Sequence, residues 1–174
     1  HPREKTIKVW CAACSTGEEA YTLSIILREF LPAGWRYQVL ATDIDQNVLT
    51  RAKMGIYTDR SVKEVPDEYY QKYIPSTSDD HCINASVREN VRFDHLNLMD
   101  EVAMQRNHGF DAVFCRNVLI YFDDLSRRTV VNYIYNALRP SGYIYLGHSE
   151  SVGRITSKFH LRRFSKVLVY QKPN

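Results

Sequence analysis

Runs of β-forming apolar residues alternate along this chain with segments whose apolar residues recur every three or four positions. The apolar runs cover residues 7–10, 37–43, 91–98, 110–115 and 143–146, and each is short enough to be a buried strand. Helical spacing is carried by Ala20, Leu23, Ile26, Leu27 and Phe30, then by Val48, Leu49 and Ala52, and later by Val130, Val131, Ile134 and Leu138. This alternation predicts an α/β domain with a mostly parallel sheet.

Residues with strong turn or capping preferences mark the ends of the predicted helices. These markers are, in chain order, Gly17 before the first helix and Pro32 and Gly34 after it, Asp45 before the second helix and Gly55 after it, and one of Asp123, Asp124 and Ser126 before the third, which stops ahead of residues 140–142. We therefore expect the fifth strand to begin only after that last turn.

Two segments do not follow the alternation. Residues 56–90 lack a sustained period and are too long for an ordinary strand–helix connection, so we expect an inserted β-subdomain. It contains a short helix that begins at Pro66 and a strand within residues 82–87. The insertion either carries a substrate or partner site or is a solvated decoration. Residues 161–164 and 167–170 are close enough in sequence to pair as a terminal antiparallel hairpin.

The composition is that of one globular domain. The 174 residues are 44% hydrophobic and 25% charged, with a net charge of +3, and a chain of this length buries about 70% of its unfolded surface. The basic residues are dispersed, which argues against nucleic-acid binding. No apolar stretch has membrane-spanning length, and no secretory signal opens the chain. We therefore expect a cytoplasmic protein without direct membrane insertion.

Cys11 and Cys14 are spaced as C-x-x-C, which raises the question of a zinc or thiol-exchange site. Neither a second C-x-x-C nor a pair of histidines follows, and both cysteines come at the end of a predicted buried strand. We favour small apolar packing for both residues, without a metal. Disulfides are not expected in a cytoplasmic protein.

The turn at residues 14–17 is where a nucleotide-like ligand is expected, because ligands of open α/β sheets bind beyond the carboxyl ends of the strands. Gly17 stands alone, without the glycine patterns of dinucleotide or triphosphate sites. Glu18 and Glu19 would repel a pyrophosphate, whereas they suit a cation. The alternative is that both acids only complement the helix dipole, an effect of about 0.3–1 kcal/mol each.

Polar residues also follow the next two strands. Asp43 ends the second strand, where such folds grip a ribose through its hydroxyls. We favour that role over helix capping, for which Asp45 is at least as well placed. Asn97 and Leu98 end the third strand. They either contact an adenine, by its edge and its face, or Asn97 only forms a turn.

The fourth strand runs directly into Arg116 and Asn117, with Tyr121 shortly after them. Arg116 is permanently charged, and its planar guanidinium can bind a carboxylate through two hydrogen bonds. This edge of the sheet is therefore the best candidate for a catalytic site. The alternative is a structural ion pair beside a core tyrosine. His148, after the fifth strand, could act as a base, but we favour a hydrogen-bonded supporting histidine.

Four sequence motifs and the order of the elements resemble one known family. The motifs are VWCAACSTGEEAY (residues 9–21), ATDID (41–45), FCRNVLIYF (114–122) and GHSE (147–150). They closely resemble the CheR-type chemotaxis receptor methyltransferases, and the likeness covers nearly the whole chain. It implies a Rossmann-like class I methyltransferase fold, with a mostly parallel seven-stranded sheet, a terminal antiparallel hairpin and a small β-subdomain inserted at about residues 56–90.

In that family S-adenosylmethionine (SAM) donates a methyl group to glutamate side chains in the cytoplasmic domain of chemoreceptors. The products are glutamyl methyl esters and S-adenosylhomocysteine, and no metal takes part. The resemblance implies Glu19 near the methionine part of SAM, Asp43 on the ribose, Asn97 and Leu98 on the adenine, Arg116 and Asn117 along the far side of the cofactor, and Tyr121 close to the transferred methyl. Tyr121 and Arg116 are the expected catalytic residues.

Two features of the family are missing from this sequence. Members carry a helical N-terminal domain and a connecting N-x-T-x-F-F-R motif, neither of which is matched, so we expect residues 1–174 to be the methyltransferase domain alone, as a monomer. Members that tether to a receptor pentapeptide have a glycine-bearing loop, whereas residues 74–80 contain no glycine. Two other functions stay open: methyl transfer to another carboxylate or a small molecule, and a SAM-sensing or receptor-docking module without turnover.

Overall fold

The computed structural model describes residues 5–77, 80–165 and 167–174. The strands of its main sheet are, in chain order, β1 (Thr6–Ala12), β2 (Arg36–Asp43), β6 (Val91–His95), β7 (Phe110–Cys115), β8 (Leu138–Leu146), β9 (His160–Phe164) and β10 (Val167–Gln171). Within the described residues the sheet has seven strands in the order β6-β2-β1-β7-β8-β10-β9. It is mostly parallel, and β10 runs antiparallel to β8 and β9. The expected α/β fold with a terminal hairpin is confirmed.

Capping residues begin and end the helices largely where the sequence predicts. The Asp45 side chain accepts a hydrogen bond from the Asn47 amide, and Gly55 ends the same helix with a left-handed φ of 63°. The helices are α1 (Glu18–Phe30), α2 (Gln46–Met54), α3 (Asp59–Val62), α4 (Asp67–Tyr73), α5 (Ala85–Arg88), α6 (Glu101–Gln105), the 3₁₀ turn η1 (Leu119–Tyr121) and α7 (Asp124–Ala137). Over the described part of the chain, no helix is long and apolar enough to cross a membrane.

The chain divides into two compact units, which are described separately. The first unit contains the chain up to Ile7 together with Cys14–His95, and the second contains Lys8–Ala13 together with Leu96–Asn174.

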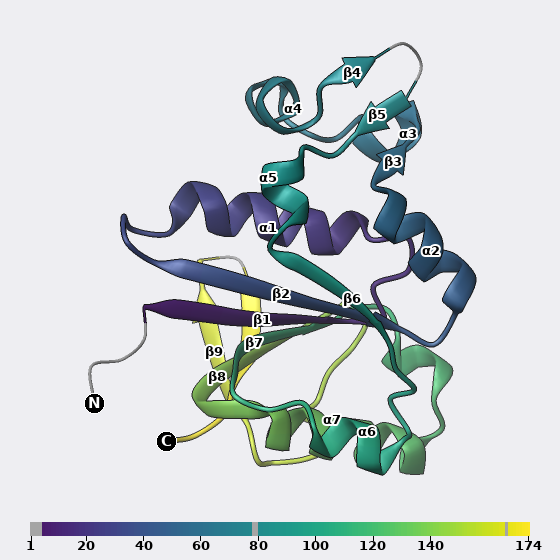
Figure 1. The fold of residues 1–174 in the computed structure, drawn as a ribbon. Helices are drawn as coiled ribbons and strands as arrows, with labels where there is room; N and C mark the ends of the chain where they lie inside the picture. Colours follow the sequence, from purple (N-terminus) through teal and green to yellow (C-terminus); the bar gives the residue numbers. More distant parts are fainter. Residues whose placement is uncertain (1–4, 78–79, 166) are drawn as a thin grey trace. The chain divides into compact units, whose positions relative to one another are not determined.

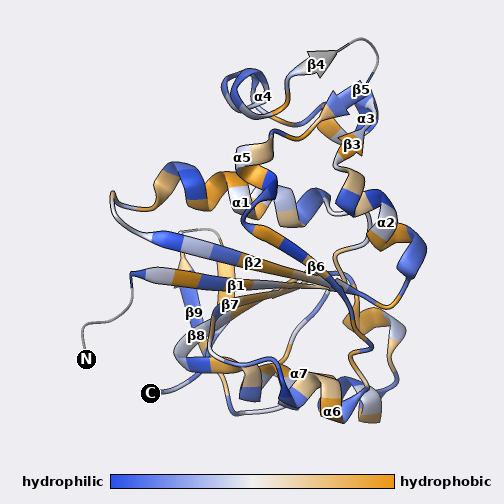
Figure 2. Cartoon of the chain, in the orientation of Figure 1, coloured by the Kyte–Doolittle hydropathy of each residue, from blue (hydrophilic) through white to orange (hydrophobic). Residues whose placement is uncertain are grey.

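In the first unit, α1 packs along β2 and beside α5, and β2 pairs in parallel with β6 (Figure 1). Strand β2 begins with hydrophilic residues and becomes hydrophobic further along (Figure 2), where Val39 and Ala41 are buried. Gly17 precedes α1 with a φ of 93°, and an added Cβ would lie 2.9 Å from the Ala52 Cβ and 3.0 Å from the Tyr57 hydroxyl. Only glycine therefore allows α1 to start so close to its neighbours.

The expected apolar stripe of α1 is partly wrong. Ile26 and Phe30 are 46% and 71% exposed, whereas Tyr21 and Ser24 are buried. The Tyr21 hydroxyl donates to the Ala52 carbonyl and the Ser24 hydroxyl to the Val87 carbonyl, each at 2.8 Å. Because their polar atoms have partners, these two residues occupy the buried face without an unsatisfied group, and a pattern based on hydrophobicity alone does not detect them.

A small antiparallel sheet also belongs to the first unit. Its strands are β3 (Ile56–Tyr57), β4 (Ser76–Thr77) and β5 (Asp80–Cys82), in the order β3-β5-β4. The expected strand at residues 82–87 is wrong beyond Cys82, because the Asn84 side chain accepts a hydrogen bond from the Ser86 amide and starts α5 instead. Of the glycine-free segment 74–80, residues 78–79 lie outside the described residues.

His81 connects the parts of this small sheet. Its Nε2 lies 2.6 Å from the Asp59 carboxylate at the start of α3, and its Nδ1 lies 2.7 Å from the Tyr70 hydroxyl of α4. Since a carboxylate only accepts, Nε2 donates to Asp59, and Nδ1 shares a hydrogen bond with the Tyr70 hydroxyl, which can donate or accept. The His81 side chain is 10% exposed and therefore joins α3, β5 and α4 from a nearly buried position.

In the second unit, Val9, Trp10 and Cys11 of β1 pair in parallel with β7, and β7 pairs in parallel with β8. The Trp10 and Phe110 rings lie 5.5 Å apart. Helices α6 and α7 lie side by side (Figure 1), and α7 buries Val130, Val131 and Ile134. Its N-cap is Asp123, which accepts from the Ser126 amide at 2.8 Å, one of the three caps that the sequence allowed.

The start of β8 differs from the prediction. Residues 140–142 do not separate helix from strand, because β8 already begins at Leu138. Its register shifts there: Leu138 lies opposite Phe110, and Tyr143 opposite Ala112. Ser141 takes a left-handed φ of 63°, and its amide donates to the Lys172 carbonyl at 3.1 Å. The turn-forming residues therefore make a bulge inside a strand rather than a loop before it.

Candidate functional site

In the first unit, the turn between β1 and α1 is fixed to the carboxyl end of β2. The Ser15 amide donates to Asp43 Oδ2 at 2.8 Å, and the Cys14 amide to the Thr42 carbonyl at 2.9 Å. Ser15 takes a left-handed φ of 49°, and Ala13, just before the turn, one of 61°. Left-handed residues other than glycine cost about 1–3 kcal/mol each and tend to occur at functional sites.

Three carboxylates gather around this turn. Burial, together with the negative charges of Asp43, Glu19 and Glu18 in that order of strength, raises the pKa of the Cys14 thiol to about 12. Glu18 accepts hydrogen bonds from the hydroxyls of Thr16 and Ser61. An acidic turn of this kind suits a cation and a ribose diol and disfavours a pyrophosphate. The first unit thus brings the predicted residues Glu19 and Asp43 to the same turn.

The sequence left open whether Asp43 caps α2 or binds a ribose, and the structure answers the first part. Asp45 is the cap of α2, as its interaction with the Asn47 amide shows. Asp43 uses one oxygen for the Ser15 amide and the other for the Asp45 amide, at 3.0 Å, so it orders the turn whatever else it binds. Its contact with a ribose stays a prediction.

Asn97 and Leu98 come shortly after β6 along the chain and belong to the second unit. The Asn97 side-chain oxygen accepts from the Met99 amide at 2.9 Å, which is the turn-forming role that the sequence left open. Leu98 is 6% exposed and packs inward. The predicted adenine contact of this pair is neither supported nor opposed by these two facts and stays a prediction.

The loop after β7 carries the other predicted residues. Arg116 and Asn117 directly follow the last residue of the strand, and both are exposed. Asn117 has a left-handed φ of 57°, after which the chain enters η1. Tyr121 ends η1 and is 81% exposed, so its hydroxyl is open to a substrate. The core position weighed for Tyr121 is therefore wrong.

Two charged residues that the sequence analysis did not select hold this loop. The half-buried Glu150 accepts four backbone hydrogen bonds: Oε2 from the amides of Asn117 and Gly147 at 2.7 and 2.8 Å, and Oε1 from those of Val118 and Leu119 at 3.1 and 2.8 Å. The position of Glu150 in the GHSE motif is the only hint that the sequence offers.

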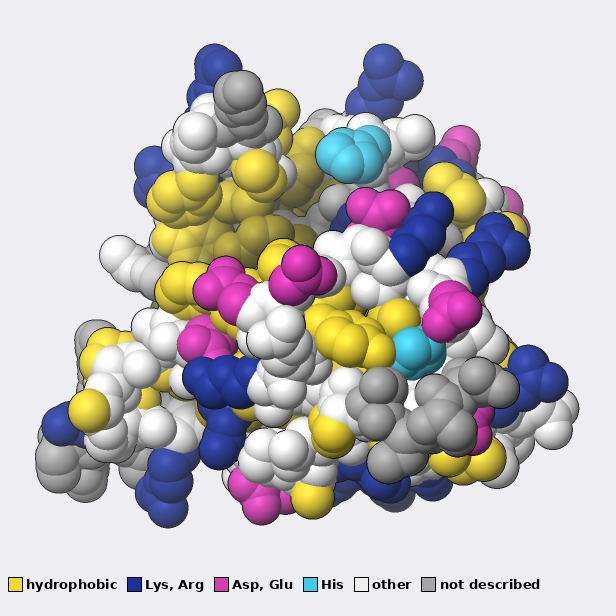
Figure 3. Space-filling view, turned by 90° about the horizontal axis from the view of Figure 1, so that it is seen from above, with side chains coloured by type: hydrophobic (Ala, Val, Ile, Leu, Met, Phe, Trp, Pro, Cys, Tyr) yellow, Lys and Arg dark blue, Asp and Glu magenta, His cyan; other side chains and the backbone are white. Residues whose placement is uncertain are grey.

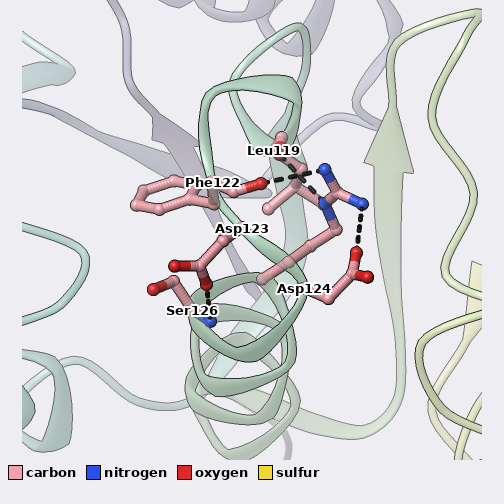
Figure 4. A network of polar contacts seen from close by, with 6 residues as sticks. Leu119, Phe122, Asp123, Asp124 and Ser126 are labelled. Atoms are coloured by element: carbon pink, nitrogen blue, oxygen red, sulfur yellow. Dashed lines mark hydrogen bonds and ion pairs between the residues drawn. The ribbon is translucent and has the colours of Figure 1, made fainter.

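The second of these residues is Arg127 of α7. Its Nε donates to the Leu119 carbonyl at 3.1 Å and its Nη2 to the Phe122 carbonyl at 2.9 Å, while Nη1 contacts the Asp124 carboxylate at 3.1 Å (Figure 4). The same close-up shows the Asp123 carboxylate at the Ser126 amide, which starts the helix below the loop.

The remaining features do not suggest other chemistry. Cys11, Cys14 and Cys115 are buried, and His148 is exposed. In the residues that the structure describes, no group of three or more His, Cys, Asp or Glu side chains could hold a metal ion. On the face in Figure 3, acidic, apolar and uncharged groups separate the Lys and Arg side chains, which do not form one basic patch.

The first unit has a pocket of about 550 Å³ that is separate from the turn before α1. It is lined by the end of α1, the start of β2 and part of α4, including Leu31, Trp35, Tyr37 and Tyr73. None of the predicted site residues lines it. Because it lies at the amino end of β2 and ligands of such sheets bind at the carboxyl ends, we do not assign it to the function.

The decisive comparison is with family models. A model described as "CheR methyltransferase, SAM binding domain" matches residues 1–168. The chain belongs to the CheR methyltransferase family. The resemblance of the four motifs to this family is therefore confirmed.

Individual CheR relatives agree with the match. Chemotaxis protein methyltransferase 2 of Vibrio cholerae is 40% identical over 177 residues, covering 100% of this chain and 62% of that protein. The chemotaxis protein methyltransferase of Escherichia coli is 36% identical over 169 residues, covering 93% of this chain and 59% of that protein. The chain thus spans about three fifths of the length of these curated CheR relatives.

Solved structures support the fold alone. The CMeT domain of the citrinin polyketide synthase superposes with a TM-score of 0.53 at 15% identity, covering 81% of this chain and 28% of that one. The DszA carbon methyltransferase gives a TM-score of 0.53 at 18% identity, with 84% and 29% coverage. The expected Rossmann-like class I methyltransferase fold of this CheR family member is confirmed.

Proposed function

We propose that the protein transfers a methyl group from SAM to glutamate side chains in the cytoplasmic domain of chemoreceptors, forming glutamyl methyl esters. The observation that carries the proposal is the match of the CheR family model to residues 1–168. Its relatives in Vibrio cholerae and Escherichia coli are named chemotaxis protein methyltransferases. The proposal includes action as a monomer in the cytoplasm, without nucleic acid and without a metal.

SAM fits the chemistry of the residues at the turn before α1. A sulfonium and an amino group are cationic, and Glu18, Glu19 and Asp43 supply negative charge there. The proposed cofactor contacts are those that the sequence predicts. They are Glu19 to the methionine part, Asp43 to the ribose, Asn97 and Leu98 to the adenine, and Arg116 and Asn117 along the far side.

The proposed reaction requires little acid–base catalysis by the protein. A free glutamate carboxyl has a pKa of about 4.3, so the accepting carboxylate is already ionised at neutral pH and needs no general base. Bound SAM supplies an activated methyl group on a positively charged sulfur. The protein's task is to align the acceptor oxygen with that methyl, and positioning of this kind supplies about 7–11 kcal/mol.

The charge change defines the roles of Arg116 and Tyr121. A carboxylate and a sulfonium neutralise each other during the transfer, so a strong ion pair to the substrate carboxylate would stabilise the ground state more than the transition state. We therefore propose that Arg116 orients the acceptor. Tyr121, whose side chain is 81% exposed, offers it one adjustable hydrogen bond.

The test combines binding and transfer. Calorimetry measures SAM binding, and tritiated SAM with chemoreceptor membranes measures transfer as base-labile methyl esters. We expect Tyr121→Phe and Arg116→Ala each to lower single-turnover transfer about tenfold or more, with Tyr133→Phe and Arg128→Ala as matched controls at wild-type rate. Wild-type transfer by both Tyr121→Phe and Arg116→Ala would remove their proposed roles.

The same experiment separates the two other functions. SAM binding without any methyl ester points to a sensing or docking module. Esters or methylated products formed only with other carboxylates or small molecules point to a different methyltransferase. Either result contradicts the proposed substrate and leaves the family membership untouched.

A further inference from the structure

We propose that Glu150 and Arg127 are positioning residues that clamp the loop of residues 116–122 and so set the place of Tyr121 and Arg116 during methyl transfer. This inference deepens the proposed function and rests on it for the kinetic part of its test. All the residues involved belong to the second unit.

Glu150 holds the donor groups of the loop. The amides of Asn117, Val118 and Leu119 are consecutive, and all three point at one carboxylate. Consecutive amides converge on an anion in turns where left-handed backbone lies next to backbone of the opposite sign of φ, which forms a concave anion site. Asn117 has the left-handed φ of 57°, and Val118 follows with φ −123° and ψ −35°. The anion for this site is supplied by the chain itself.

The parallel pairing of β7 and β8 brings the two segments together. Cys115 and Leu146 are register partners at the ends of these strands, so residues 116 and 147 leave the sheet side by side. A Cβ on Gly147 would collide with Asn117 Oδ1 and would lie 2.8 Å from Glu150 Oε2. Gly147 therefore lets the Glu150 carboxylate reach the loop, and its own amide gives the fourth hydrogen bond.

Arg127 holds the acceptor groups of the same loop. Its guanidinium binds the carbonyls of Leu119, the first residue of the 3₁₀ turn η1, and of Phe122, the residue directly after it (Figure 4). Asp124 orients the guanidinium from the other side. The loop is thus fixed by a carboxylate on its amides and by a guanidinium on its carbonyls, both of which are charge-assisted hydrogen bonds.

This double clamp has a functional reason. Tyr121 is so exposed that packing of its own side chain does little to place it, and a misplacement of about 1 Å in a reacting geometry can cost about 100-fold in rate. The backbone must therefore supply the precision. Neither Glu150 nor Arg127 is proposed to touch the cofactor or the acceptor.

The test uses two nearly isosteric variants of the protein at its full native length. Glu150→Gln turns one oxygen into a donor that faces two amides. Arg127→Lys keeps the charge but loses the fork that binds two carbonyls at once. Matched controls are Glu101→Gln, which removes the same charge from exposed α6, and Arg128→Lys, the exposed neighbour of Arg127.

We expect amide hydrogen exchange of residues 117–122 to rise about tenfold or more in both variants, with unchanged protection in β7 and β8. The turnover number for methyl transfer should fall about tenfold or more, measured where the variants are fully folded. The dissociation constant of SAM should rise only about threefold, because most proposed cofactor contacts lie outside the loop. If Glu150 and Arg127 only stabilised the fold, the variants would have a lower melting temperature, and their turnover number would not fall more than their SAM affinity.

The outcomes are distinguishable. If the wild type transfers methyl groups and both variants keep its turnover number and exchange rates, the inference is overturned. If the wild type transfers nothing, the proposed function fails, and the exchange of residues 117–122 alone decides whether the clamp exists. Should Glu150→Gln fail to fold, Arg127→Lys decides by the same two measurements.

Discussion

The Cys14 thiol lies where burial and three carboxylates act in the same direction. Desolvation and the charges of Asp43, Glu19 and Glu18 raise its pKa to about 12. A thiol that keeps its proton is a poor nucleophile near neutral pH. Cys11 and Cys14 are both buried at the end of β1, as expected for residues that pack there.

Alkylation tests this directly. At pH 8 we expect iodoacetamide to modify the half-exposed Cys82 well before Cys14 in the folded protein, because Cys14 is both buried and protonated. Peptide mass spectrometry over a time course gives the two rates. Modification of Cys14 as fast as Cys82 would contradict the raised pKa.

The same pKa predicts a loss of stability in alkali. Between about pH 9 and pH 12 the unfolded chain releases the Cys14 proton while the folded chain keeps it. The unfolding free energy therefore falls as pH rises through this range and is fully retained below it. Urea denaturation at a series of pH values should show a shallower fall for Cys14→Ala than for the wild type. Parallel curves would exclude a contribution from Cys14.

At the level of single residues, the sequence predicts local roles such as helix capping better than it predicts hydrogen-bond partners that are distant along the chain. The capping of α2 by Asp45 was predictable because an acid immediately before a helix is a preferred N-cap, and Asp45 has that position. The role of Glu150 was not predictable, since three of its four donors are backbone amides on a segment more than thirty residues away. No spacing rule connects two loops that only the pairing of β7 with β8 brings together.

Among the elements, α7 depends on its cap. The backbone amide of Ser126 lowers the pKa of the Asp123 carboxyl below its ordinary 3.8. The stabilisation is therefore present above that value and disappears as pH falls through the lowered pKa. We expect Asp123→Ala to lower the melting temperature at pH 7, whereas Asp123→Asn keeps the cap and loses the acid dependence. Thermal melts at pH 7 and pH 3 check both statements, and equal melts for all three proteins would refute them.

The small sheet depends on His81 in a comparable way. His81→Leu removes two hydrogen bonds from a side chain that is 10% exposed, which should cost about 1–3 kcal/mol of unfolding free energy. Limited proteolysis should then cut within residues 56–82 sooner, whereas the exposed His108→Leu serves as a control without effect. A variant as resistant as the wild type would mean that packing alone holds the sheet.

The errors in element prediction share one cause, which is that local patterns do not register distant partners. Pro140 and Gly142 are typical of a turn, yet the last residues of the chain pair with this segment and keep it inside β8. Residues 82–87 read as a strand until Asn84 caps α5. On α1, Ser24 is buried because Val87 accepts its proton.

At the scale of the whole molecule, ligand binding should appear as stability. A ligand that binds only the folded state at a hundred times its dissociation constant adds about 2.7 kcal/mol to the unfolding free energy, or roughly 5–10 °C for a domain of this length. We expect SAM to produce such a shift and NADH, with its pyrophosphate, to produce none. Differential scanning fluorimetry measures both, and a shift with NADH alone would reverse the electrostatic argument.

The alternation of strands and helices and the mostly parallel sheet were predictable from the sequence, because most of the β-forming runs are followed by a helix or hairpin of distinct spacing. For the predicted ligand-binding residues, the sequence indicated which chemical groups a ligand would need but not the hydrogen bonds that hold those residues in place. Asp43 binds the Ser15 amide of the turn before α1, and both Asp43 and Glu19 act on the Cys14 thiol of that turn by their charge. Arg116, Asn117 and Tyr121 share one loop. Their joint action on a single cofactor is a matter for the binding and transfer measurements.

The left-handed backbone of Ala13 and Ser15 sets a limit on how this protein can be made more heat-resistant. Glycine adopts that conformation without steric penalty, so a search for thermostable variants would be drawn to these two positions. The same exchange would free the segment that carries Ser15 to the Asp43 carboxylate. Gains in melting temperature obtained there should come with slower turnover, a trade-off in which activity is lost as strain is relieved.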